Sequence, residues 1–324
     1  MGVGPREGPL EPGDIYMPRA DTRTKWQIIK DAIYNPTEGT IFGHTKKRWG
    51  IVGLFYLIFY SVLAVLCAIC MMGLLATIDE NRPTYTLDSS IIGTNPGLGF
   101  RPTPDNIKER SLIWYSSSNA TQIKRWVTLL NVFLEKYLNK TKLISAGRNQ
   151  VICDYDKPPK KGKVCTVDVN SWGPCTSTLN YGYNNSSPCV FIKLNKIYDW
   201  VPEFYNDTKN LPNDMPQDLK NHIRGLDKSK LNTIWLSCMG IDPHDKEAIG
   251  ELEYYPKFRG FPGYYYPYLN LPEYLSPVIA VHFKRPQRNK VISIECRAWS
   301  KNIIYKHDKG IQSGSVHLEI LIDD

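Results

Sequence analysis

The longest hydrophobic stretch of the chain covers residues 49–78 and contains no charged residue. At about 1.5 Å of rise per residue, a helix of this length exceeds the roughly 20 residues needed to cross a bilayer core. Three basic residues (46–48) stand immediately before it, and two acidic residues (79–80) follow it. The positive-inside rule then places residues 1–48 in the cytosol and everything after about Ile78 outside. The pattern predicts a single-pass type II membrane protein.

Two other kinds of apolar helix fit this stretch less well. A cleaved signal peptide has an apolar region of about 7–15 residues and ends at a small-residue cleavage site. This stretch begins only at residue 49, is about twice as long, and ends Leu75-Ala76-Thr77-Ile78. A buried helix of a soluble core is usually shorter and charged on one face. The interpretation is therefore a signal-anchor helix.

Helical spacing recurs in two further segments. Residues 23–34, with Trp26, Ile29 and Ile33, predict a short amphipathic helix suited to a membrane surface or a partner. Residues 120–138 carry an apolar stripe at helical spacing, which predicts one helix packed on a core. Prolines and glycines interrupt the stretch that follows the span, so residues 79–104 are interpreted as an extended stalk.

Beyond residue 147 the chain changes to short apolar segments separated by Pro, Gly and Asn. The last of them alternates, with Val316, Leu318 and Ile320 on one face of a strand. Five segments are predicted to be strands: 190–194, 233–238, 278–283, 291–296 and 316–322. Short strands with a single flanking helix indicate an immunoglobulin-like β-sandwich.

Six of the eight cysteines follow the predicted span. Six cysteines in an oxidising compartment indicate three disulfides, although the sequence alone permits fifteen pairings. Pairing between neighbours is the simplest arrangement: Cys153 with Cys165, Cys175 with Cys189, and Cys238 with Cys296. Cys67 and Cys70 lie within the span, where a free thiol behaves as a small apolar side chain.

Sequons for N-linked glycans give the same topology. Five lie after the span, at Asn119, Asn139, Asn184, Asn185 and Asn206. The single candidate before the span, Asn35-Pro36-Thr37, has the forbidden proline. The predicted organisation is a cytosolic tail (1–48), a transmembrane signal-anchor helix (49–78), a stalk (79–104) and a disulfide-bonded, glycosylated extracellular β-sandwich domain (105–324).

No catalytic constellation is evident. The sequence lacks G-x-S-x-G, P-loop and H-E-x-x-H motifs, and no metal-ligand spacing occurs outside the membrane, so we expect no catalytic residue, no metal and no cofactor apart from N-linked glycans. Asp154 and Asp156 resemble the D-x-D motif of type II glycosyltransferases, but without the α/β pattern of those enzymes. Asp242, His244 and Asp245 are interpreted as a turn. The net charge of +8 is spread along the chain, which disfavours a nucleic-acid partner.

Two aromatic features remain. Residues 254–268 hold eight aromatic side chains and three prolines, which suits either a preorganised protein-binding loop or a loop covering its own core. Within the span, Tyr56 and Tyr60 are four residues apart and share a helix face, and Phe55 and Phe59 share the adjacent one. A tyrosine hydroxyl inside the hydrocarbon is costly without a partner, so this face is predicted to contact another transmembrane helix.

Taken together these motifs resemble the β subunit of the Na⁺/K⁺-transporting P-type ATPase, a family shared with the gastric H⁺/K⁺ pump. The similarity extends over nearly the whole chain from about Trp26, and the sequence resembles an invertebrate member of the family more than a vertebrate one. Its most specific segments are Ile41-Phe42-Gly43-His44-Thr45, Leu54-Phe55-Tyr56-Leu57-Ile58-Phe59-Tyr60, Cys189-Val190-Phe191-Ile192-Lys193-Leu194-Asn195, Tyr265-Tyr266-Pro267-Tyr268, Pro277-Val278-Ile279-Ala280-Val281-His282-Phe283 and Ile294-Glu295-Cys296-Arg297-Ala298.

The resemblance implies a non-catalytic subunit of the plasma membrane. Such a subunit assists folding, assembly and delivery of the catalytic α subunit and modulates K⁺ binding, sometimes beside a small single-span regulatory subunit. It also implies the neighbour pairing of the six cysteines. The positions implied to contact the α subunit are Tyr56, Phe59, Tyr60, Tyr265, Tyr266, Pro267 and Tyr268.

The chain departs from the family at two places. The segment after Tyr268 continues as Leu269-Asn270 instead of Tyr-Gly-Lys, and the first cysteine loop, Cys153 to Cys165, is short and expected to be peripheral. Alternative hypotheses are a β subunit of an H⁺/K⁺ pump, a pump-independent adhesion or junction protein, a type II glycosyltransferase, and a receptor-like lectin.

Overall fold

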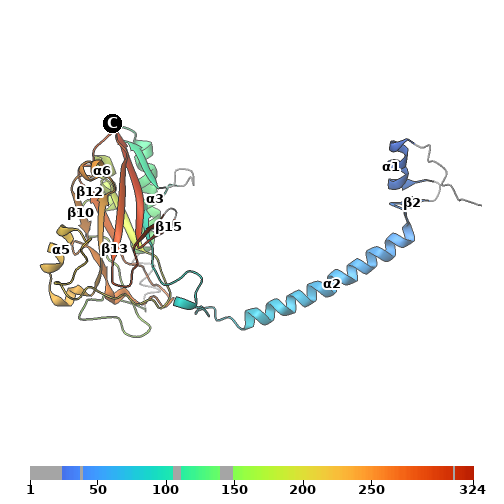
Figure 1. Ribbon diagram of the computed structural model, residues 1–324, viewed down its shortest axis with the longest axis horizontal. Helices are drawn as coiled ribbons and strands as arrows, with labels where there is room; N and C mark the ends of the chain where they lie inside the picture. Colours follow the sequence, from blue (N-terminus) through green and yellow to red (C-terminus); the bar gives the residue numbers. More distant parts are fainter. Residues whose placement is uncertain (1–23, 37–38, 105–110, 139–148, 309–310) are drawn as a thin grey trace, which may run out of the picture. The chain divides into compact units, whose positions relative to one another are not determined.

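A computed structural model describes residues 24–36, 39–104, 111–138, 149–308 and 311–324. The chain divides into two compact units, one up to Ile78 and the other from Asp79 to Asp324 (Figure 1).

The first unit contains two helices and a small antiparallel sheet of order β1-β2-β3. Thr24 and Gln27 cap each other at the start of the first helix, because the Thr24 N–H donates to Gln27 Oε1 over 3.1 Å. The predicted amphipathic helix is present, with Trp26, Ile29 and Ile33 exposed. The elements are α1 (Lys25–Ile33), β1 (Tyr34–Asn35), β2 (Thr40–Ile41), β3 (His44–Thr45) and α2 (Lys46–Ala76).

Helix α2 contains most of the predicted span. It has 31 residues, a mean hydropathy of 2.5 and no buried residue in its most apolar window, so by length and composition it can cross a membrane. The helix begins at the basic residues before the uncharged stretch and ends at Ala76, with the Thr77 N–H bonded to the Leu74 carbonyl. The Ser61 hydroxyl donates to the Leu57 carbonyl over 2.7 Å, so it is satisfied within the helix.

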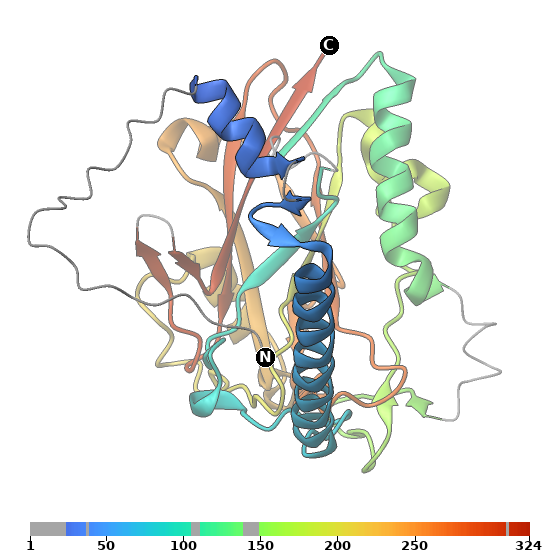
Figure 2. The ribbon, with the colours of Figure 1, turned by 90° about the vertical axis from the view of Figure 1, so that its right-hand side faces the viewer.

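The second unit is built on two β-sheets (Figures 1 and 2). All strand pairs within them are antiparallel except β16 with β5, which is parallel. The four-stranded sheet has the order β10 (Leu252–Tyr255), β12 (Val278–Phe283), β8 (Cys189–Leu194), β4 (Leu98–Arg101). The five-stranded sheet has the order β11 (Gly260–Pro262), β9 (Thr233–Gly240), β13 (Ile292–Trp299), β16 (Ser315–Asp323), β5 (Leu112–Ser116).

One hydrophobic core joins the two sheets and helix α3 (Ala120–Leu138). Every residue of β12 is buried, because that strand is covered on both faces. Phe191 of β8 packs on Trp172 and Tyr181 and lies 6.3 Å from the Phe133 ring of α3. Figure 2 shows α3 alongside the sheets. The predicted helix and its inward stripe are therefore confirmed, with Ile123, Trp126, Val127, Leu130, Leu134 and Tyr137 buried.

The expectation of a single flanking helix was wrong. Two short helices, α5 (Gln217–Arg224) and α6 (Pro243–Ala248), also lie in this unit. Helix α6 starts where the residues interpreted as a turn, Asp242 and Asp245, form a capping box. Helices of six or eight residues carry too few turns to produce a clear periodic pattern. They are held by tertiary packing, as with Leu219 and Ile223 of α5.

The five predicted strands are present as β8, β9, β12, β13 and β16. Strands β4, β5, β10 and β11 of the two sheets lie outside those predictions. Strand β4 falls in the stretch interpreted as a stalk, yet Leu98 and Phe100 are buried in the core, because β4 pairs with β8. The smaller elements are η1 (Leu87–Ser89), η3 (Ser177–Asn185), η4 (Lys228–Leu231), η5 (Gly263–Tyr265), β6 (Gln150–Val151), β7 (Val164–Cys165), β14 (Lys306–Asp308) and β15 (Ile311–Ser313).

Three disulfides cross-link the second unit, between the same neighbours as in the simplest pairing: Cys153–Cys165, Cys175–Cys189 and Cys238–Cys296. The last joins directly opposite residues of β9 and β13, with Cα atoms 4.0 Å apart. Cys67 and Cys70 are free and exposed on α2.

Candidate partner-binding surfaces

The first candidate surface is the aromatic face of helix α2. The Tyr56 and Tyr60 rings stack with centroids 6.0 Å apart, and the Phe55 and Phe59 rings stack at 6.1 Å. All four side chains are exposed. The helical spacing thus produces a continuous aromatic ridge that can pack against another apolar helix.

The second candidate surface is the tyrosine segment, residues 263–268, which follows β11. Its path depends on Gly263, whose N–H donates to the Asn232 carbonyl over 2.8 Å. A Cβ atom at Gly263 would lie 2.5 Å from the Phe204 ring and 2.8 Å from the Asn232 oxygen. Only glycine therefore lets the segment approach these neighbours so closely.

Two tyrosines of this segment direct their hydroxyls into the protein. The Tyr265 hydroxyl donates to the Thr166 carbonyl over 2.8 Å. The Tyr266 ring meets Trp200 edge-on at 5.8 Å, and its hydroxyl is buried with no hydrogen-bond partner among the described residues. Burial raises the pKa of both tyrosines, so both stay protonated. Their hydroxyls point into the protein, and only parts of their rings are accessible to solvent.

Tyr268 lies differently. Its hydroxyl donates to Asn270 Oδ1 over 2.8 Å on the surface, and its carbonyl accepts the Asp199 N–H at 2.9 Å. Its ring packs against Tyr274 with centroids 4.9 Å apart. The Lys196 ammonium lies 4.8 Å from the Tyr268 centroid and 5.1 Å from that of Tyr274. Tyr268 is thus the tyrosine of the segment whose polar end is on the surface.

The first cysteine loop supports the tyrosine segment, so the expectation that it is peripheral was wrong. Tyr155 from this loop packs edge-on against Tyr264 at 5.3 Å. Its hydroxyl is 2.7 Å from Thr233 Oγ1. Burial, opposed by this hydrogen bond, raises the pKa of Tyr155 to about 12. Thr166, which accepts the Tyr265 hydrogen bond, directly follows Cys165. The first cysteine loop and the residue after it therefore contact Tyr264 and Tyr265 of the segment.

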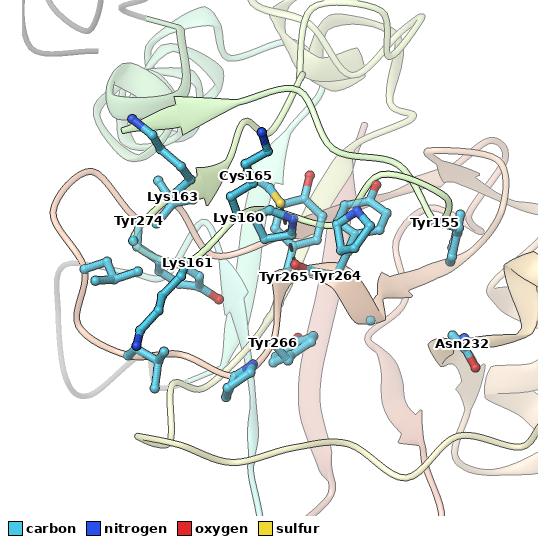
Figure 3. A pocket seen from close by; sticks show the side chains of 18 of the residues that line it. Tyr155, Lys160, Lys161, Lys163, Cys165, Asn232, Tyr264, Tyr265, Tyr266 and Tyr274 are labelled. Carbon is cyan, nitrogen blue, oxygen red and sulfur yellow. Dashed lines mark hydrogen bonds between the residues drawn. The ribbon is translucent and has the colours of Figure 1, made fainter. Parts of the chain in front are cut away.

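A hollow of about 440 Å³ lies between the same loop and the tyrosine segment. In Figure 3, Lys161 and Lys163 lie on one side of it and Tyr155 and Asn232 on the opposite side. Tyr264, Tyr265 and Tyr266 occupy the middle of that view. The hollow has basic and aromatic walls and borders the tyrosine segment.

The predicted glycosylation sites fall on the surface where the structure describes them. Asn119, Asn184, Asn185 and Asn206 are exposed. Asn119 precedes α3, and its Oδ1 accepts the Thr121 N–H at 3.1 Å. Asn139 lies outside the described residues.

The acidic motif considered for a glycosyltransferase lies on the surface. Asp154 is exposed, and its backbone N–H and carbonyl form hydrogen bonds with the backbone of Lys157. Within the described part of the chain, no group of three or more His, Cys, Asp or Glu side chains is arranged to hold a metal ion.

Comparison with known proteins decides the family. Residues 19–318 match the family model described as sodium/potassium ATPase beta chain. The chain belongs to the sodium/potassium ATPase β-chain family. It is similar to sodium/potassium-transporting ATPase subunit beta-2 of Drosophila melanogaster, with 50% identity over 95% of this chain and 96% of that protein. Subunit beta-1 of the same organism is 43% identical over 92% of this chain and 94% of its own length.

A more distant relative is the probable sodium/potassium-transporting ATPase subunit beta-3 of Caenorhabditis briggsae, 29% identical over 96% of this chain. The similarity to insect proteins confirms the expectation of an invertebrate-like member. The family is the non-catalytic, accessory chain of the pump, so the glycosyltransferase hypothesis is set aside.

Three residues that pack against the tyrosine segment were absent from the predicted contact residues: Tyr155, Lys196 and Tyr274. Lys196 directly follows a family-like segment, Cys189–Asn195, but is far along the chain from Tyr268. Periodicity within one segment cannot predict the contact between Lys196 and Tyr268. Lys196 follows β8, and it meets Tyr268 only because the fold brings these distant parts of the chain together.

Proposed function

We propose that this chain accompanies the catalytic α subunit of a P-type Na⁺/K⁺ pump as its single-span β subunit. It assists folding of the α subunit and its delivery to the plasma membrane, and it tunes K⁺ binding. The observation that carries the proposal is 50% identity to a pump β subunit over nearly the whole length of both proteins. The membrane-compatible helix α2 and the three disulfides agree with it.

Affinity capture of the tagged full-length chain from native membranes in mild detergent tests this function. We expect a P-type ATPase catalytic subunit to co-purify, and its identity defines the ions transported. Capture that brings down no P-type ATPase overturns the proposal. A small single-span regulatory subunit in the same eluate stays a prediction.

We propose a type II orientation, with residues 1–48 in the cytosol and an immunoglobulin-like sandwich outside the cell. The basic cluster before α2 and the exposed sequon asparagines support it. Endoglycosidase treatment should lower the apparent mass, and replacing Asn119 and Asn206 by Gln should remove part of that shift. A mass unaffected by the enzyme contradicts this orientation.

Within the membrane, we propose that Tyr56, Phe59 and Tyr60 face a transmembrane helix of the α subunit. All three rings are exposed, with Tyr56 stacked on Tyr60 and Phe59 edge-on to Tyr60, which supports this assignment. Outside it, Tyr265, Tyr266 and Pro267 present ring faces to the α subunit, and Tyr268 presents its polar edge.

The double variant Tyr56→Ala/Tyr60→Ala tests the intramembrane contact. We expect a shift in the K⁺ concentration that half-activates the pump, with assembly largely retained, because the ridge is lost but the helix remains. The matched control is Leu57→Ala/Ser61→Ala, which has the same spacing on another helix face. Unchanged K⁺ activation in the tyrosine variant, or an equal shift in the control, refutes the assignment.

A further inference from the structure

Four cationic side chains lie near one another, and one of them, Lys196, lies over Tyr268. We call Arg101, Lys136, Lys193 and Lys196 the basic cluster. Lys193 of β8 lies opposite Gly99 of β4, and a Cβ atom at Gly99 would be 3.6 Å from Lys193 Cε. The lysine side chain therefore lies across Gly99. Arg101 lies two residues further along β4, on the same face.

The cluster continues onto α3 and to the tyrosine segment. The Arg101 guanidinium lies 6.0 Å from the Phe133 ring, and Lys136 is one helical turn beyond Phe133. At the other end, the Lys196 ammonium lies over the Tyr268 and Tyr274 rings. Two aromatic rings thus hold one of the cations at a defined position next to the surface tyrosine.

None of these four cations has a carboxylate within ion-pair distance in the described part of the chain. Asp199, whose N–H bonds to the Tyr268 carbonyl, and Glu273, the sequence neighbour of Tyr274, form no salt bridge with the cluster in the described part of the chain. Some other cations of this unit do pair with carboxylates, as in Arg259–Asp218 and Lys284–Glu251. The positive charges of the cluster are therefore not neutralised by any carboxylate of the described residues.

Partial burial makes this charge unfavourable for the isolated subunit. Burial lowers the pKa of Lys193, and the nearby charges of Arg101 and Lys196 lower it further. Burial also lowers the pKa of Lys196, with a smaller effect of Lys136. Like charges held together oppose folding unless an anion is bound.

The surface around Tyr268 also contacts the first residues of the second unit. Asn270, bonded to Tyr268, donates from Nδ2 to the Asn81 carbonyl over 3.3 Å.

We propose that the basic cluster is a docking site for an acidic exoplasmic segment of the catalytic subunit, continuous with the Tyr268 surface. This inference rests on the proposed function, since it names the chemistry of that partner's segment. Carboxylates of the segment would pair with Lys193 and Lys196, and Arg101 and Lys136 would extend the complementary charge. Unlike a contact made only by aromatic rings, such an interface weakens as salt screens it.

The experiment uses the full-length chain co-expressed with a tagged catalytic subunit. The variant is Lys193→Glu/Lys196→Glu, and the matched control is Lys209→Glu/Lys228→Glu, at lysines that are exposed and without ion pairs among the described residues. The amount of β chain retained on the captured catalytic subunit is measured after washes in about 0.1 M and about 1 M salt, where the Debye length falls from about 10 Å to about 3 Å.

We expect the cluster variant to retain about three- to tenfold less than the unmodified chain in low salt, the size expected for two partly exposed ion pairs. The difference should shrink in high salt, and the control should match the unmodified chain. Equal retention in low salt, an equal loss in the control, or a loss independent of salt each overturns the proposal.

A neutral variant, Lys193→Met/Lys196→Met, separates misfolding from loss of docking. It removes the repulsion while keeping the apolar stems, so its thermal stability should be equal or higher although its retention falls. Lower stability together with lower retention contradicts the inference. If the variants change binding to vesicles of phosphatidylserine but not to the catalytic subunit, the anion is a lipid and the proposal fails. If the unmodified chain does not co-purify at all, it is the proposed function that fails.

Discussion

Adjacent tyrosines in one surface segment have different environments. The Tyr265 hydroxyl donates to a carbonyl of the first cysteine loop, the Tyr266 hydroxyl is buried without a partner among the described residues, and the Tyr268 hydroxyl lies on the surface. The sequence Tyr265-Tyr266-Pro267-Tyr268 contains no sign of this difference, because it depends on Thr166 and Trp200, which approach from elsewhere in the chain.

At the residue scale, replacing each buried hydroxyl separates these roles. We expect Tyr265→Phe to lower the free energy of unfolding by about 1 kcal/mol, since the Thr166 carbonyl loses its donor. Tyr266→Phe removes a hydroxyl that makes no hydrogen bond to a described residue, so it should be neutral or stabilising. Chemical denaturation of the detergent-solubilised chain measures both. A larger loss of stability for Tyr266→Phe than for Tyr265→Phe contradicts this picture.

At the element scale, close backbone packing holds short helices that have little stability of their own. Helix α6 has six residues and lies against the end of β9 at Gly240. A Cβ atom at Gly240 would be 2.3 Å from the Asp245 carbonyl carbon and 2.4 Å from the Lys246 nitrogen. These are backbone atoms of α6, so the helix and the strand would have to separate to admit a side chain.

We therefore expect Gly240→Ala to destabilise the chain by about 1–3 kcal/mol, the usual range for overpacking. Gly225→Ala is the matched control, because its nearest neighbours would be 3.5 Å away, at ordinary contact distance. The control should change stability by less than about 1 kcal/mol. Thermal unfolding of both variants measures the difference, and similar midpoints would show that α6 does not depend on this contact.

At the scale of the whole molecule, the second unit buries many phenol groups. Burial raises the pKa of Tyr155 and Tyr181 to about 12, and raises those of Tyr115, Tyr137 and Tyr183 as well. In the unfolded chain tyrosine titrates near pH 10. The folded chain therefore keeps protons that the unfolded chain releases.

Stability should consequently fall as pH rises above about 10, because the folded state then binds more protons than the unfolded state. The contribution of these tyrosines is fully present below pH 10 and declines between about pH 10 and 12. The lowered pKa of Lys193 and Lys196 acts in the opposite direction, but it concerns fewer groups. Unfolding midpoints in denaturant at several alkaline pH values test this, and a midpoint constant up to pH 12 would be incompatible with it.

The sequence by itself determined the elements whose signal is local. Helix α2 follows from an uncharged stretch, α3 from one apolar stripe, and the five predicted strands from short apolar segments. It also determined the family, because the motifs are contiguous strings of residues. It left fifteen disulfide pairings open until the resemblance was added.

Tertiary structure alone decided what depends on distant residues meeting. It moved β4 from the stalk into the core, through pairing with β8. It placed the first cysteine loop under the tyrosine segment, and it brought Lys196 to Tyr268. Periodicity records which face of one element is apolar, but it carries no information on which other element that face will meet. The membrane-compatible helix was therefore readable from the sequence, whereas the charge and shape of the proposed docking surface were not.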